Sequence, residues 1–257
     1  MNPVGALGKK VFFLYPPPVL AEIMEGLAKR EFEVYTARSH KKLLKVLAQE
    51  PESIVFINID DESLDDGEWQ DYVRGLREGE TTAGVGVGIL TLNEPSPELR
   101  ERYLMDIQVP CGFVVLKIGA TKTTEILVKT LEANEARGRR KFVRAICSPG
   151  SGHFAATHEG KSLNGSVSDL SSAGFAVGFE DKTQLKVGTV VRGVLLTVKG
   201  VRIGADAFVA AMRTNGESTT HVLMFVPGAN DEHRLEKLRS LVFRINQTAM
   251  DSLMAGA

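Results

Sequence analysis

The stretch RGRRKFVRAIC, residues 137–147, divides the chain into two parts with different patterns. Before it, short apolar runs alternate with segments of helical period, and after it short strands follow one another with turns between them. The stretch begins with five basic residues in eight, although the whole chain of 257 residues has a formal net charge of only −1. We therefore expect two domains, residues 1–136 and 137–257, joined at a basic segment.

The two parts carry opposite net charges. The first holds 15 Lys and Arg against 22 Asp and Glu, a net charge of −7, and the second holds 16 against 10, a net charge of +6. A basic second part favours an anionic partner, which could be a nucleotide, a nucleic acid or the acidic first part.

Upstream of residue 137 the pattern predicts a parallel sheet covered by helices on both faces. A final helix over 121–135 is expected to end near Gly138. The glycines within 84–88 lack the third glycine of a dinucleotide site, so we expect them to permit close packing. The expected strands are VFFLY, FEVYT, SIVFINI, VGVGILT and CGFVVLK, at residues 11–15, 32–36, 53–59, 85–91 and 111–117.

This order of elements resembles the receiver domain of response regulators, a flavodoxin-like α/β fold. The resemblance implies a phosphoryl-accepting aspartate at the end of the third strand, where this chain has Asn58. It also implies an acidic pair after the first strand, where this chain has prolines 16–18. A carboxamide is a poor phosphoryl acceptor, so the resemblance is to a degenerate receiver. We interpret Asp60 and Asp61 as part of a solvated loop rather than a metal site.

Downstream of the basic segment, the turn signals at 148–152, 164–165, 200 and 215–216 separate short strands. We expect a small closed barrel, because closure removes the exposed edges of a sheet. The segment 141–147 is expected to be its first strand. Leu235, Leu238, Val242 and Ile245 recur at helical spacing and predict a C-terminal helix against the barrel.

Two short motifs in this part have complementary chemistry. Arg140 and Arg144 are four residues apart, and in an extended segment their side chains would lie on one side, up to about 13 Å apart. Guanidinium groups bind phosphate and the O6 and N7 edge of guanine. In DLSSAG, at 169–174, the Asp169 carboxylate and the Ser171 hydroxyl can bond the N–H groups of guanine, and Gly174 permits a tight turn.

RKFVR at 140–144 followed by DLSSAG at 169–174 resembles the RxxxR and (D/N)xSxxG signature of PilZ domains, bacterial receptors for cyclic di-GMP. The resemblance implies a six-stranded barrel with a C-terminal helix over 137–257. It also implies that Arg140, Arg144, Asp169, Ser171 and Gly174 bind cyclic di-GMP, with help from Arg139. A receiver-like domain ahead of PilZ is similar to two-domain PilZ proteins of spirochaetes.

The resulting hypothesis is a non-enzymatic cyclic di-GMP effector. Ligand binding would change the interdomain orientation and so signal to an unidentified protein partner, in motility, biofilm formation or virulence. Two alternatives stay open, a ligand-free PilZ-like interaction module and a nucleic-acid-binding regulator. Two cysteines and no signal-peptide pattern suggest a cytoplasmic protein. The sequence predicts no catalytic site, metal site, cofactor or membrane partner.

Overall fold

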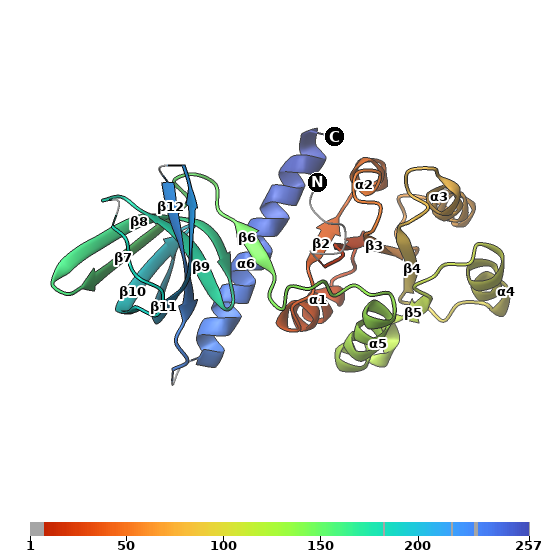
Figure 1. Ribbon diagram of the computed structural model, residues 1–257. Coiled ribbons are helices and arrows are strands. Elements are labelled where there is room, and N and C mark those ends of the chain that lie inside the picture. Colours follow the sequence, from red (N-terminus) through yellow and green to blue (C-terminus); the bar gives the residue numbers. More distant parts are fainter. Residues whose placement is uncertain (1–7, 182, 217, 229–230, 257) are drawn as a thin grey trace. The chain divides into compact units, whose positions relative to one another are not determined.

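The computed structural model describes residues 8–181, 183–216, 218–228 and 231–256. The chain forms two compact units, Met1–Lys141 with Gln247–Ala257, and Phe142–Asn246. Figure 1 shows that the first unit is an α/β domain and the second a β-barrel, as the sequence predicted. None of the helices in the described ranges combines the length and apolar character needed to cross a bilayer.

The α/β unit is built on a parallel sheet of order β2-β1-β3-β4-β5 in the described residues. This is the flavodoxin-like order that the sequence predicted. Its strands are β1 (Val11–Leu14), β2 (Val34–Ala37), β3 (Ile54–Asn58), β4 (Gly86–Thr91) and β5 (Phe113–Val115). Its helical elements are α1 (Leu20–Lys29), α2 (His40–Leu47), α3 (Asp66–Glu78), α4 (Pro97–Glu101), η1 (Arg102–Asp106), η2 (Leu116–Ile118) and α5 (Ala120–Ala133).

Both faces of this sheet are buried, which is why its strands are almost wholly apolar. Helices α2 and α3 lie on one face and α1 and α5 on the other (Figure 1). Successive residues Phe12 and Phe13 point to opposite faces, and each ring stacks on a ring of a neighbouring strand. At Gly88 a Cβ atom would lie 2.6 Å from the ring of Phe56, so the glycine allows close packing of β3 and β4.

The end of α5 differs from the sequence prediction. The helix stops at Ala133 rather than near Gly138. Glu135 takes the left-handed conformation at φ +54° that we had assigned to glycine, and the N–H of Ala136 donates to the carbonyl of Leu131 at 2.9 Å. The residues up to the basic segment therefore form a loop.

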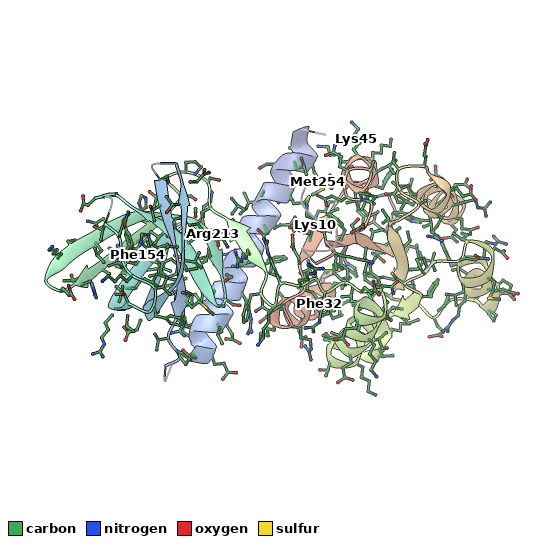
Figure 2. The ribbon with its side chains drawn as sticks, in the orientation of Figure 1. Lys10, Phe32, Lys45, Phe154, Arg213 and Met254 are labelled. Carbon is green, nitrogen blue, oxygen red and sulfur yellow. The ribbon has the colours of Figure 1, made fainter. Side chains whose placement is uncertain are left out.

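The last turns of the C-terminal helix α6 (Asp231–Gly256) belong to the α/β unit. The Gln247 side chain accepts from the N–H of Thr36 at 2.8 Å and donates to its carbonyl at 3.0 Å. Because β2 is an edge strand, this pair of bonds satisfies backbone groups that would otherwise be open. Met250 and Met254, the latter labelled in Figure 2, are buried in the core on the same side of the sheet as α2 and α3.

One strand, β9, closes the barrel by pairing with a strand on each side. The described order is β6-β8-β7-β10-β11-β12-β9, and β9 also pairs with β8, so the last six strands form a ring with β6 added outside it. All these pairings are antiparallel. The strands are β6 (Arg144–Ile146), β7 (Gly152–His158), β8 (Lys161–Ser171), β9 (Gly174–Phe179), β10 (Val190–Val198), β11 (Val201–Asn215) and β12 (Ser218–Phe225).

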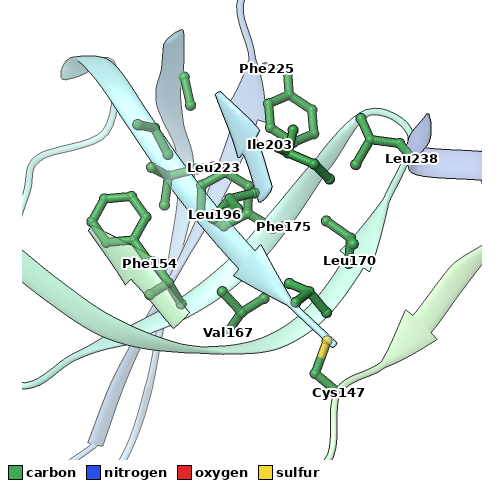
Figure 3. Packing of buried hydrophobic residues seen from close by; sticks show 14 of the residues in the cluster. Cys147, Phe154, Val167, Leu170, Phe175, Leu196, Ile203, Leu223, Phe225 and Leu238 are labelled. Carbon is green, nitrogen blue, oxygen red and sulfur yellow. The ribbon is translucent and has the colours of Figure 1, made fainter. Parts of the chain in front are cut away.

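Inward-facing side chains of these strands fill the barrel (Figure 3). Phe154 and Phe175 are buried near its centre, with ring centroids 5.9 Å apart. The first turns of α6 complete this core, which confirms the predicted packing of a C-terminal helix on the barrel. Their buried residues are Leu238, Leu241, Val242 and Ile245.

His221 on β12 is a buried histidine without a charged partner among the described residues. Its Nε2 accepts from the N–H of Leu185 at 3.2 Å, so the proton of the neutral ring lies on Nδ1, which has no hydrogen-bond partner in the described part of the chain. The ring also packs on Phe179, with centroids 4.7 Å apart. Burial lowers the pKa of His221, so the imidazole stays neutral in the folded barrel.

We expect this histidine to make the barrel less stable in acid. As pH falls below about 6.5, the pKa of the histidine in the unfolded chain, the unfolded chain binds a proton that His221 in the folded barrel does not bind. The free energy of unfolding then falls by at most about 1.4 kcal/mol per pH unit. Urea unfolding between about pH 7.5 and about pH 5.5, roughly one unit either side of that value, measures the slope. His221→Gln keeps an acceptor for Leu185 but does not titrate, and an equal slope in that variant would contradict the assignment.

Candidate functional site

The two sequence motifs of the barrel unit lie on paired strands. Strand β6 runs antiparallel to the end of β8, with Arg144 opposite Ser171 and Ile146 opposite Asp169. Between them, Ala145 opposes Leu170, and both are fully buried in the barrel core. Since side chains alternate across a strand, Arg144, Ile146 and Asp169 share the opposite, outward face, while Ser171 at the end of β8 is buried. We call Arg144, Ile146 and Asp169 the outer face of the β6–β8 pair.

Arg144 is held by its backbone and leaves its side chain available. Its carbonyl accepts from Nδ2 of Asn246 on α6 at 3.1 Å, and β6 pairing fixes the rest of its main chain. Within the described residues its guanidinium forms no ion pair, and the side chain is half-buried. The backbone of Arg144 is therefore fixed, while its guanidinium has no ion-pair partner among the described residues.

Asp169 is also half-buried, and no described residue forms an ion pair or hydrogen bond with its carboxylate. Its negative charge affects the buried thiol of Cys147. Burial raises the pKa of the Cys147 thiol, and the negative charge of Asp169 raises it further. A bulge in β8 between Val167 and Asp169 turns Asp169 away from the core while Val167 and Leu170 stay inside it.

Ser171 and Gly174 have clear structural roles. The Ser171 hydroxyl donates to the carbonyl of Gly174 at 3.1 Å and accepts from its N–H at 3.2 Å, which closes the turn between β8 and β9. Ser171 is 7% exposed. A Cβ atom on Gly174 would lie 2.1 Å from the carbonyl oxygen of Leu223 on β12, so only glycine fits there. Both residues shape the turn beside the outer face.

Arg139 and Arg140 precede the barrel unit, which begins at Phe142. Both are exposed. The extended strand predicted from residue 141 begins only at Arg144, because Lys141 and Phe142 lie in a bend. Arg140 and Arg144 therefore do not lie on one continuous strand, which was the condition for their side chains to share a side. In the α/β unit, Arg140 lies close enough to Glu33 to oppose the rise in the pKa of that carboxyl, which burial causes.

At the edge of the parallel sheet where β3 ends, the side chain of Asn58 is already bonded within the protein. Asn58 ends β3 and is buried, and its Nδ2 donates to the carbonyl of Tyr15 at 2.9 Å. We expected Asp60 to be a solvated loop residue, and this expectation is wrong. Its carboxylate accepts hydrogen bonds from the hydroxyl of Thr91 at 2.8 Å and from the N–H of Leu92. These bonds tie the ends of β3 and β4 together.

A cavity of about 630 Å³ lies at this edge. Prolines 16–18 form part of its wall and Arg38 is a basic residue in its lining. The described residues contain no group of three His, Cys, Asp or Glu side chains that could hold a metal ion. Two polar residues of the lining, Asn58 and Asp60, are bonded within the protein.

No protein-family model and no curated protein matches this chain. Solved structures are similar to less than half of it. The complex of YcgR from Escherichia coli with c-di-GMP is 14% identical, with 47% of this chain and 52% of that chain covered and a TM-score of 0.41. The K. pneumonia MrkH–c-di-GMP complex is 14% identical, with 46% and 57% covered and a TM-score of 0.40.

The inhibitor of motility MotI/DgrA from Bacillus subtilis is 18% identical, with 41% of this chain and 50% of that chain covered and a TM-score of 0.33. This chain thus spans only about half the length of these three proteins. The likeness is distant and partial.

Proposed function

We propose that this protein is a cytoplasmic, non-enzymatic receptor for cyclic di-GMP, with the PilZ-like barrel as its ligand-binding part. The observation that carries the proposal is the register of β6 and β8, which puts Arg144 and Asp169 on one outward face. A guanidinium and a carboxylate on the same face match the acceptor and donor edges of guanine. Exposed Arg139 and Arg140, just upstream, supply positive charge for the phosphates of the ligand.

The position of the basic segment suggests how binding would be transmitted. The boundary between the compact units falls between Lys141 and Phe142, inside the stretch from Arg140 to Arg144. A ligand that engages both arginines would restrict the residues between them. It would favour one interdomain orientation to the extent that it binds that orientation more tightly. Residues 1–136 would then present a changed surface to a protein partner, in motility, biofilm formation or virulence.

A ligand-free interaction module is the second candidate. It is favoured by the turn, because the Ser171 hydroxyl is already bonded to Gly174 in both directions and Gly174 is required by the approach of β12. Two of the five signature residues are thereby explained without any ligand. Arg144 and Asp169 have no such structural explanation, which is why we rank the receptor first.

Calorimetric titration of the full chain with cyclic di-GMP tests the proposal, with GTP as a control. We expect saturable binding with a dissociation constant in the micromolar range or tighter, and no comparable heat with GTP. The stoichiometry would distinguish a single bound ligand from an intercalated pair. Folded protein that gives neither heat nor a thermal shift would contradict the receptor and favour the interaction module. Equal competition by DNA or RNA, with steep loss of binding in salt, would favour the nucleic-acid alternative.

A further inference from the structure

Ile146 is the most exposed large hydrophobic residue among those described, with 74% of its surface accessible. It lies on the outer face of the β6–β8 pair, directly opposite Asp169 and two residues after Arg144. Its neighbour Ala145 is fully buried. The pairing with β8 therefore fixes Ile146 in this outward position, where its side chain gains nothing from the barrel core.

The spacing around Ile146 matches a flat ligand. Arg144 and Ile146 are about 7 Å apart along the strand, and directly opposed residues such as Ile146 and Asp169 have Cβ atoms about 5 Å apart. Arg144 and Asp169 are diagonal neighbours at about 7–8 Å, and they form no ion pair in the described residues. An exposed apolar surface is thus flanked by two unpaired groups of opposite charge.

We propose that Ile146 is a ligand-contacting platform on which one guanine base of cyclic di-GMP lies flat, between Arg144 and Asp169. In this arrangement the O6 and N7 edge of the base accepts from the Arg144 guanidinium. The N–H edge of the same base donates to the Asp169 carboxylate. The base face covers the Ile146 side chain and removes its apolar surface from water. This inference rests on the proposed function and adds a contact outside both signature motifs.

The platform is tested by calorimetry on the full chain with cyclic di-GMP. Ile146→Ala is expected to weaken binding about tenfold, because part of a large apolar contact is lost. Leu195→Ala is the matched control, since Leu195 is a 43% exposed apolar side chain on β10 and is not part of the outer face. Neither change should lower barrel stability, because both side chains are exposed.

Ile146→Trp supplies an independent readout. The chain has a single tryptophan, Trp69, which is fully buried in the α/β unit. An added indole at 146 should stack on the base, keep or improve affinity, and change its fluorescence as ligand saturates. If the unaltered protein does not bind cyclic di-GMP, the proposed function itself fails. If it binds, but Ile146→Ala binds equally well or the indole signal does not respond, the platform is wrong and the receptor stands.

Discussion

Replacing Arg144 by alanine is expected to weaken cyclic di-GMP binding at least about a hundredfold while leaving the barrel folded. A bidentate guanidinium contact contains two charge-assisted hydrogen bonds, each worth about 1.5–3 kcal/mol. Their loss therefore exceeds the 2.7 kcal/mol or so that corresponds to a hundredfold. The fold should survive, because β6 is held by its backbone pairing with β8 and by the bond from Asn246 to the Arg144 carbonyl.

Three further variants make this experiment specific. Arg144→Lys keeps the charge but not the planar fork, so an intermediate loss is expected. Arg140→Ala should also weaken binding, through loss of the proposed contact with a ligand phosphate. Arg202→Ala removes an exposed arginine of β11 and should leave affinity unchanged. If Arg202→Ala weakened binding as much as Arg144→Ala, the arginines would act only through general charge and the β6–β8 site would be wrong.

The sequence predicted the architecture because both units follow simple patterns. Residues 54–57 are apolar because β3 is covered on both faces, and their β-branched side chains favour a strand over a helix. The turn signals between short successive strands of the second part predicted a closed barrel. The two motifs lie on neighbouring strands, because β6 carries Arg144 and pairs with the end of β8, which carries Asp169.

What the sequence did not predict depends on register and on contacts between distant segments. Ile146 becomes part of the candidate site only through its pairing with Asp169, which no local pattern specifies. Likewise, the helical period of α6 predicts an apolar stripe but does not say that Met250 and Met254 pack in the α/β unit. Asp60 was misread as solvated because its partner Thr91 lies 31 positions further along the chain.

Gly174→Ala is expected to destabilise the barrel severely, by about 3 kcal/mol or more. The added Cβ would lie 2.1 Å from the carbonyl oxygen of Leu223 and 3.0 Å from the Cα of Met224. Both atoms are backbone, so no side chain can rotate away to make room. Moving β12 would break its pairing with β9, where Gly174 lies opposite Met224.

The site of this clash makes the effect global rather than local. Strand β9 pairs with both β8 and β12, and these two ladders close the ring of strands. A shift at Gly174 therefore opens the barrel at its seam and disturbs the core on both sides, where Phe175 is 1% exposed. The same shift would distort the turn between β8 and β9, because the Ser171 hydroxyl bonds both the N–H and the carbonyl of Gly174.

Gly178→Ala on the same strand is the matched control, because a Cβ there meets nothing within 4 Å. Its free energy of unfolding should stay within about 0.5 kcal/mol of the unaltered protein. Urea unfolding followed by circular dichroism compares the two variants without any ligand. Equal stabilities would show that β12 can move away from an alanine at 174. Barrel closure would then not explain the glycine of the second motif, and a bound ligand would be the remaining explanation. A large loss confined to Gly174→Ala would establish that this glycine is required by barrel closure, so that Arg144 and Asp169 alone carry the case for a guanine ligand.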